Sequence, residues 1–149
     1  MAENRIPAEV TEALRQAIDA AGITEQTDLV ARILAIIAEE NNDEKGLIWP
    51  EAVAPFDVHV VATGKDELAY TVAEGAIAQL EAAGLDVIFD DRPKVSPGVK
   101  FGDAELIGVP RVLVVGRGVA EGQVELWNRA TGERETLALA DAVAQLTAK

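Results

Sequence analysis

Residues 56–89, FDVHVVATGKDELAYTVAEGAIAQLEAAGLDVIF, decide the fold. Residues 56–62 are a β-rich run typical of a strand, residues 65–83 favour a helix that Gly84 closes, and residues 85–89 favour a second strand. A strand, a helix and a strand in succession form a right-handed crossover between parallel strands. This stretch therefore predicts the start of a parallel sheet that is covered by a helix.

The sequence after this unit continues the alternation. It predicts a shorter helix over 97–107, a strand over 111–115, two strands over 123–128 and 133–137 joined by a hairpin turn, and a closing helix over 139–147. The order βαβαββα predicts an α/β layer fold with a mixed sheet and a hairpin at one edge.

The first 46 residues have a different pattern from the rest. Apolar residues at helical spacing predict two helices, arranged as an N-terminal helical hairpin, and the second helix is apolar on more than one stripe. Residues 47–55 contain two prolines and predict an extended linker. We therefore expect a helical segment over 1–46, a linker over 47–55 and an α/β domain over 56–149.

Composition limits the function classes. The chain has 149 residues, no cysteine and a net charge of −13, which excludes a disulfide scaffold, a cysteine zinc site and a thiol nucleophile. The acidic balance argues against a general nucleic-acid or anionic-membrane binder, because affinity for phosphate comes from Lys and Arg. The sequence has no signal peptide and no apolar run of about 20 residues, so we expect a cytoplasmic protein.

Basic residues follow the three strands that we expect to be parallel. Ligands of open parallel sheets bind at the carboxyl ends of the strands, where Lys65, Arg92, Lys94 and Arg117 are expected to converge. Residues 92–117 carry five basic and two acidic residues, a net charge of +3, and the remainder carries −16. This edge suits an anionic or nucleotide-like ligand, and the alternative is ordinary solvated loop charge.

Candidate catalytic residues do not form a set. His59 is the only histidine and stands within a strand, where a structural role is favoured, and Ser96 fits the N-cap of the following helix. Asp90 and Asp91 are adjacent, so they point to opposite faces of a strand and do not form a carboxylate pair. Asp91 could join Asp66 at a magnesium ion, but orientation of Arg92 is favoured. The sequence therefore predicts a binding module.

Several segments carry a resemblance to a known family. Residues 33–50 (ILAIIAEENNDEKGLIWP) and 54–61 (APFDVHVV) resemble the end of the catalytic core and the start of the anticodon-binding domain of bacterial prolyl-tRNA synthetases. Residues 90–92 (DDR), 97–101 (PGVKF) and 103–111 (DAELIGVPR) resemble later signatures of this family, the last two of which other class II synthetases share. The resemblance runs from about residue 32 to the C-terminus.

The resemblance implies a three-layer anticodon-binding fold that binds the anticodon loop of proline tRNA, whose second and third anticodon bases are guanines. Such loops are bound by stacking and by hydrogen bonds to base edges. By hypothesis Arg92 and Lys100 contact bases or phosphates, Lys94 and Arg111 contact phosphates, and Asp91 or Glu105 accepts from guanine N–H groups. Phe101, or else Phe89, stacks on a base. For the two phenylalanines a core position is the alternative, and for Arg111 capping of the sheet.

The chain also departs from the family pattern. Arg32 falls at the position of an ATP-binding arginine, but no glycine-rich strand precedes it, and residues 1–26 do not resemble the family. We therefore expect a part of a synthetase without its catalytic domain, with no cofactor in this chain and with ATP and Mg²⁺ acting in the parent enzyme. Two other functions stay open: a structural module that forms a homodimer through the N-terminal helices, and a small-nucleotide-binding α/β protein.

Overall fold

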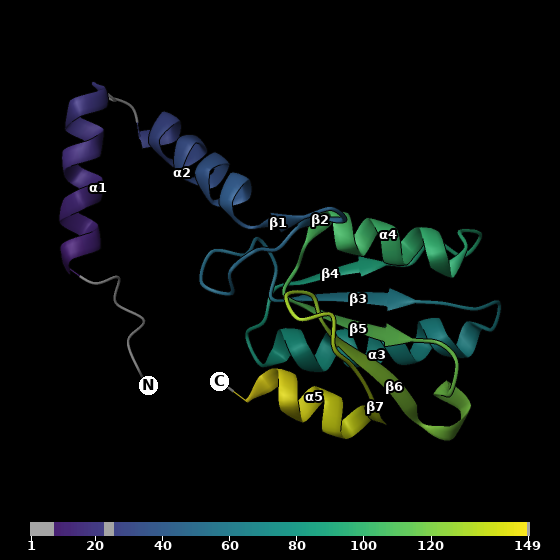
Figure 1. Cartoon of the computed structure of the whole chain (residues 1–149). Coiled ribbons are helices and arrows are strands. Elements are labelled where there is room, and N and C mark those ends of the chain that lie inside the picture. Colours follow the sequence, from purple (N-terminus) through teal and green to yellow (C-terminus); the bar gives the residue numbers. More distant parts are fainter. Residues whose placement is uncertain (1–7, 23–25, 149) are drawn as a thin grey trace. The chain divides into compact units, whose positions relative to one another are not determined.

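A computed structural model describes residues 8–22 and 26–148, and it divides the chain into two units after Glu40. The first unit contains helices α1 (Ala8–Ala21) and α2 (Gln26–Glu40), which are the two helices predicted there (Figure 1). The turn that would make them a hairpin lies outside the described residues. Val30, Leu34 and Ile36 of α2 are exposed, so part of its apolar surface has no cover in this unit.

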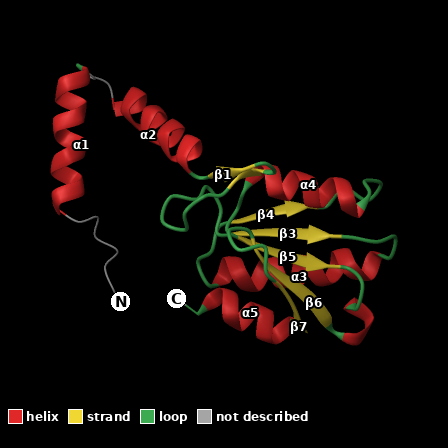
Figure 2. Ribbon diagram, in the orientation of Figure 1, coloured by secondary structure: helices red, strands yellow, loops and turns green. Residues whose placement is uncertain are grey.

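The second unit contains the α/β domain (Figure 2). Its elements are β1 (Asn42–Asp43), β2 (Gly46–Leu47), β3 (Val58–Ala62), α3 (Glu67–Ala82), β4 (Val87–Asp90), α4 (Pro97–Ile107), β5 (Arg111–Val115), the 3₁₀ turn η1 (Val119–Glu121), β6 (Gln123–Asn128), β7 (Arg134–Ala138) and α5 (Leu139–Thr147). From β3 to α5 the helices and strands follow the order βαβαβββα, which has one strand more than the predicted order βαβαββα. The bounds of α4, β5, β6 and α5 are those predicted.

The main sheet has the strand order β4-β3-β5-β6-β7. Strand β3 pairs in parallel with both β4 and β5, and β6 and β7 add antiparallel strands beyond β5. Helices α3 and α5 cover one face and α4 covers the other, which makes three layers (Figure 1). The larger core packs Val60 and Leu113 against Leu80 of α3, and a smaller core packs Val61 and Trp127 against α4.

The start of this unit differs from the prediction. The linker was expected over 47–55, but residues 41–47 already form a small β-hairpin, with Asn42 paired to Leu47. The backbone N–H of Trp49 donates to the carbonyl of Gly108 at 3.0 Å, which attaches this segment to the end of α4. Two-residue strands have no hydrophobic period, so the sequence pattern did not indicate them.

Local signals placed α4 correctly. Ser96 is its N-cap, with the side chain accepting from the N–H of Val99, and Pro97 stands at the first helical position. Gly108 ends the helix with φ 76°. The predicted N-capping role of Ser96 is therefore confirmed. Within the described residues no helix is both long and apolar enough to span a membrane.

Candidate functional site

The topology of the sheet creates a crevice between β3 and β5. The chain leaves β3 through α3 on one face and reaches β5 through α4 on the other, and β4 and β5 lie on opposite sides of β3. In open α/β sheets, ligands bind at such a switch in strand order, beyond the carboxyl ends of the strands. A cavity of about 420 Å³ occupies this place; among its lining residues are Thr63, Gly64, Asp66, Phe101, Val114, Gly116, Arg117, Glu125 and Arg134.

The floor of the crevice depends on a glycine. A Cβ at Gly116 would overlap the hydroxyl oxygen of Thr63 and lie 3.2 Å from its Cβ and carbonyl oxygen, so the two strand ends approach each other closely. Both residues line the cavity. A side chain at position 116 would displace the hydroxyl group of Thr63 from its place in the cavity.

A cation stacked on aromatic rings forms one wall. The guanidinium of Arg134 lies 4.2 Å from the ring centroid of Trp127 and 5.4 Å from that of Phe101. Trp127 is only 3% exposed and faces Arg134 directly across the β6–β7 ladder. Cation–π contacts of this kind hold an arginine flat against the ring. The crevice therefore has a planar wall of the kind on which a nucleobase can stack.

The charges in the crevice do not neutralise one another. Arg117 and Arg134 contribute positive charge, and Asp66 and Glu125 contribute carboxylates. Among the described residues, no ion pair joins any two of these four side chains. Asp66 is the N-cap of α3, but its side chain makes no capping hydrogen bond. These donors and acceptors are therefore available to a ligand.

A second group of charges lies at the end of β4. Arg92 donates from Nε to Oδ1 of Asp90 at 2.9 Å and from Nη2 to Oδ2 at 2.6 Å. The same Nη2 also donates to Asp103 on α4 at 2.6 Å. An arginine has five N–H donors, so these bonds leave only the Nη1 group for a ligand. Arg92 remains 45% exposed, so that group can be reached from solvent.

Lys100 does not lie where the RNA-contact hypothesis requires. Its side chain is fully buried, and Nζ donates to the carbonyl of Ala62 at 2.6 Å and to that of Asp90 at 3.3 Å. It also lies 3.5 Å from Oδ1 of Asp90 and 5.5 Å from the ring centroid of Tyr70. Because these partners enclose the ammonium, Lys100 supports the carboxyl ends of β3 and β4 instead of facing a ligand.

The carboxyl group of Asp90 is held in its charged form. Its hydrogen bonds from Arg92 lower its pKa to about 2, against the opposing effect of burial, and the charge of Lys100 acts in the same direction as Arg92. The pKa of Arg92 is raised by its hydrogen bonds to Asp90 and then to Asp103. Asp90 and Arg92 therefore both keep their charges over the whole physiological range.

This shift predicts a pH dependence of stability. A carboxyl whose pKa is lower in the folded state stabilises the fold above its unfolded pKa of 3.8, and that contribution is lost as the pH falls toward 2. The urea midpoint of the wild-type chain should therefore fall between pH 4 and pH 2 more steeply than that of Asp90→Asn. Urea unfolding at several pH values measures this. Asp91→Asn removes the exposed neighbouring carboxyl, and an equally flat profile for that variant would contradict the assignment to Asp90.

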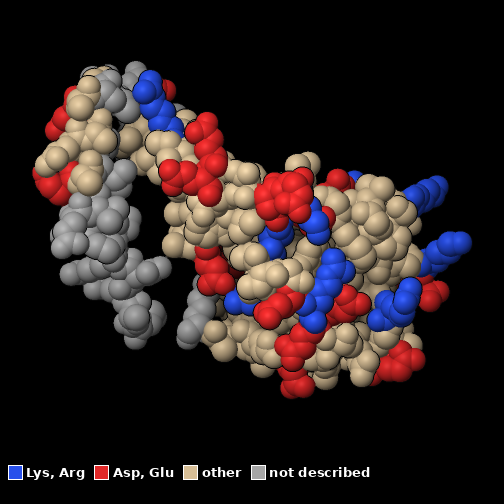
Figure 3. Space-filling view, viewed as in Figure 1, with Lys and Arg blue, Asp and Glu red and all other residues tan. Residues whose placement is uncertain are grey.

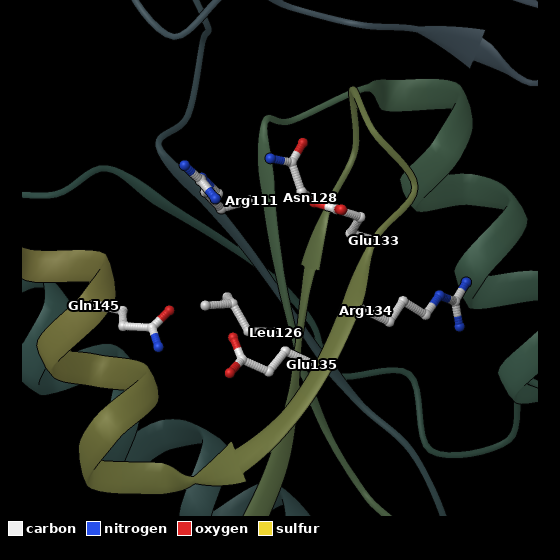
Figure 4. Close-up of a pocket in the computed structure, with 7 residues that line it drawn as sticks. All are labelled: Arg111, Leu126, Asn128, Glu133, Arg134, Glu135 and Gln145. Carbon is white, nitrogen blue, oxygen red and sulfur yellow. The ribbon is translucent and has the colours of Figure 1, made fainter.

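The remaining predicted contact residues are dispersed. Asp91 and Lys94 are exposed in the loop after β4, whereas the Glu105 carboxylate pairs with Lys45 at 3.1 Å. Arg111 pairs with Glu51 at 3.3 Å and begins β5, so it lies away from the carboxyl ends. There it lines a different pocket of about 530 Å³ with Leu126 and Gln145 (Figure 4).

Two further residues, His59 and Phe89, contribute to the packing of the domain. His59 is 1% exposed on β3, and burial lowers its pKa, in keeping with the structural role that was favoured for it. Its Nδ1 atom has no hydrogen-bond partner among the described residues. Phe89 is partly buried against the core on the α3 face.

The structure does not bring together the two residues considered for magnesium. Asp66 and Asp91 line separate cavities.

The predicted convergence of basic residues is found in part. Lys65, Lys94 and Arg117 are exposed in the loops that follow β3, β4 and β5, and basic side chains project beyond this edge (Figure 3). Arg92 turns back onto Asp90. Sequence reasoning missed Arg134 and Glu125 as crevice residues. The register of the β6–β7 hairpin is the signal that could have placed them, because it sets Arg134 opposite Trp127.

The α/β domain that contains this crevice matches a known protein family. The model of the family described as "Anticodon binding domain" matches residues 57–149, which is the α/β domain from the start of β3 onward. The chain belongs to the anticodon-binding domain family. The prediction of an anticodon-binding fold is therefore confirmed, and the family match begins one residue after the predicted start of the domain.

Individual relatives extend the similarity beyond the family match. The chain is 76% identical over 118 residues to a protein named "Proline--tRNA ligase" from Leifsonia xyli subsp. xyli, covering 79% of this chain and 20% of that protein. Proteins of the same name from Clavibacter sepedonicus and Kineococcus radiotolerans are 61% and 62% identical over 119 and 117 residues. These matches cover 80% and 78% of this chain and 20% of each relative. The chain thus spans about a fifth of the length of these curated relatives.

Proposed function

We propose that this chain binds the anticodon loop of proline tRNA, as the anticodon-binding part of a cytoplasmic prolyl-tRNA synthetase. The observation that carries the proposal is the membership of residues 57–149 in the anticodon-binding domain family, together with 76% identity to a relative named "Proline--tRNA ligase". The attachment of proline to tRNA, with ATP and Mg²⁺, is proposed for the whole enzyme and not for this chain.

The geometry supports this proposal through the crevice. An unstacked loop base needs a flat surface and a few directed hydrogen-bond partners. Arg134 on Trp127 provides the flat surface, and Arg117, Asp66 and Glu125 provide donors and acceptors. The exposed Lys65 and Lys94 lie in the loops beside the crevice, where they suit the phosphates of the same loop.

Binding of a synthetic anticodon stem-loop tests the proposal. We expect the chain to bind the stem-loop of proline tRNA more tightly than one with altered anticodon bases, because base edges carry sequence information and phosphates do not. Arg134→Ala should weaken binding by roughly tenfold, since loss of one base-stacking contact is worth about 1–3 kcal/mol. Fluorescence anisotropy titrations at several salt concentrations measure both effects.

Matched variants separate base contacts from phosphate contacts. Lys94→Ala should weaken binding to all the stem-loops alike and reduce the salt dependence. Arg15→Ala, on α1 and outside the α/β domain, should change nothing. Equal affinity of the wild-type chain for the native and altered anticodons would reject anticodon recognition. An unchanged affinity of Arg134→Ala would reject the crevice as the place of binding.

A homodimer through the N-terminal helices stays a prediction. Val30, Leu34 and Ile36 expose apolar surface on α2, which suits an interface with a second copy or with another part of a synthetase. Within the described residues nothing shows which of these covers the helix.

The hypothesis of a small-nucleotide-binding protein places its ligand in the same crevice. Titration with a free nucleotide in place of RNA distinguishes this function from anticodon binding.

A further inference from the structure

We propose that Glu125 makes the crevice selective for guanine, by accepting hydrogen bonds from the N1–H and N2–H groups of an inserted base. This inference rests on the proposed function, because it concerns which base of the loop enters the crevice. For this contact the inference names a residue other than Asp91 and Glu105, which the resemblance to the synthetases suggested.

The position of Glu125 follows from the sheet. It lies on β6 two residues before Trp127, so strand alternation puts both side chains on the α4 face. Its register partners are Val114 on β5 and Thr136 on β7, and Val114 also lines the cavity. Glu125 therefore lies next to the wall that Arg134 and Trp127 form.

The carboxylate of Glu125 is half-buried and has no described partner. Two guanidinium groups line the same cavity, but neither is within ion-pair distance of Glu125 among the described residues. A carboxylate that has lost part of its water gains strongly from new hydrogen bonds. The acidic residue on the other side of the crevice, Asp66, is exposed and remains hydrated.

The chemistry of the four bases then decides the ligand. A carboxylate only accepts hydrogen bonds, and its two oxygens suit two parallel N–H donors. On its Watson–Crick edge guanine alone presents two adjacent donor groups. Adenine and cytosine pair a donor with an acceptor, and uracil presents one donor between two acceptors. A guanine stacked beside Arg134 therefore satisfies Glu125, and any other base leaves an acceptor facing it.

Other residues of the crevice are compatible with this arrangement. The cavity of about 420 Å³ lies within the range of sites for small ligands and admits one nucleobase with part of its ribose. Arg117 is exposed at the mouth, where it suits the phosphate of the inserted nucleotide. This positive charge offsets the repulsion between Glu125 and the RNA backbone.

The test compares Glu125→Gln with the wild-type chain on stem-loops in which each anticodon guanine is replaced singly by adenine or by inosine. For the guanine that enters the crevice, we expect the wild type to lose about tenfold or more in affinity with adenine. Inosine, which lacks the 2-amino group, should give an intermediate loss. Glu125→Gln should bind guanine more weakly and lose its preference over adenine, because the glutamine amide offers one acceptor where two are needed.

The matched control is Glu121→Gln, which removes an equal charge from the exposed η1 turn nearby and should alter the affinity for all stem-loops alike. Urea unfolding confirms that each variant is folded, and the inosine series with the wild-type chain tests the inference without any variant. If Glu125→Gln keeps the full preference for guanine, or if inosine is bound as well as guanine at every position, the inference is overturned while anticodon recognition stands. If the wild type shows no preference among anticodons, both the role of Glu125 and the proposed anticodon recognition are rejected.

Discussion

Gly108→Ala is expected to lower the free energy of unfolding by about 3 kcal/mol or more. Gly108 ends α4 with φ 76° and ψ 26°, a left-handed conformation that costs other residues about 1–2 kcal/mol. An added Cβ would also overlap the backbone carbonyl of Leu47 in β2, and overpacking costs about 1–3 kcal/mol. The alanine would therefore both strain the end of α4 and displace the β1–β2 hairpin. Urea unfolding followed by circular dichroism measures the loss.

Substitutions of two other glycines in the same domain separate the cost of the left-handed conformation from the cost of the overlap with Leu47. Gly84 follows α3 with φ 86° and has open space where a Cβ would lie, so Gly84→Ala should cost only the conformational part, about 1–2 kcal/mol. Gly102 lies within α4 and is also open, so Gly102→Ala should stabilise the chain by about 0.5–1 kcal/mol. Equal losses for Gly108→Ala and Gly84→Ala would show that the contact with Leu47 carries no free energy.

The ends of α4 could be predicted from the sequence, whereas the β1–β2 hairpin could not. Gly108, Pro97 and Ser96 mark the ends of α4 by local chemistry, and α4 was placed to the residue. The β1–β2 hairpin was missed, because its stability comes from distant residues. Asp43 in this hairpin pairs with Arg129, 86 residues later in the chain. A pattern read within a short window contains no information about such a pair.

In the candidate site, too, the sequence pattern does not predict contacts between residues that are far apart in the chain. The sequence placed the ligand edge at the carboxyl ends of the strands, and the crevice is there, because that edge follows from topology alone. The individual contacts depend on which side chains the folded chain buries. Lys100 and Arg92 look alike in sequence, yet Lys100 is fully buried beneath β3 and β4 while Arg92 is 45% exposed. Arg134 looks like an ordinary hairpin residue until the register sets it over Trp127.

Arg129→Met is expected to lower the free energy of unfolding by about 2 kcal/mol, because it removes the hydrogen bonds of a buried arginine to a partly exposed carboxylate. Arg129 follows β6 and is only 4% exposed. Its Nη1 and Nη2 groups donate to the two carboxylate oxygens of Asp43 at 2.9 and 2.7 Å, and Nε donates to the carbonyl of Glu105 at 3.1 Å. Methionine keeps most of the side-chain volume but none of these hydrogen bonds. The carbonyl of Glu105 then loses its side-chain donor.

The pair also links the hairpin to the rest of the domain. The hydrogen bond from Arg129 is the largest cause of the lowered pKa of Asp43, and the same bond raises the pKa of Arg129. Asp43 in turn accepts from the backbone N–H groups of Lys45 and Gly46, which fixes the hairpin turn. Loss of Arg129 should therefore loosen residues 41–47 first, and hydrogen exchange at the Gly46 and Ile48 amides would detect it.

The matched control for Arg129→Met is Lys45→Met. Lys45 pairs with Glu105 at 3.1 Å in the same region, but its side chain is 53% exposed. An exposed ion pair contributes about 0–1 kcal/mol, so Lys45→Met should leave the urea midpoint nearly unchanged. If the two variants lose the same stability, burial of Arg129 has no energetic consequence. A larger loss confined to Arg129→Met, with faster exchange at Gly46, would instead assign the attachment of the hairpin to this one buried arginine.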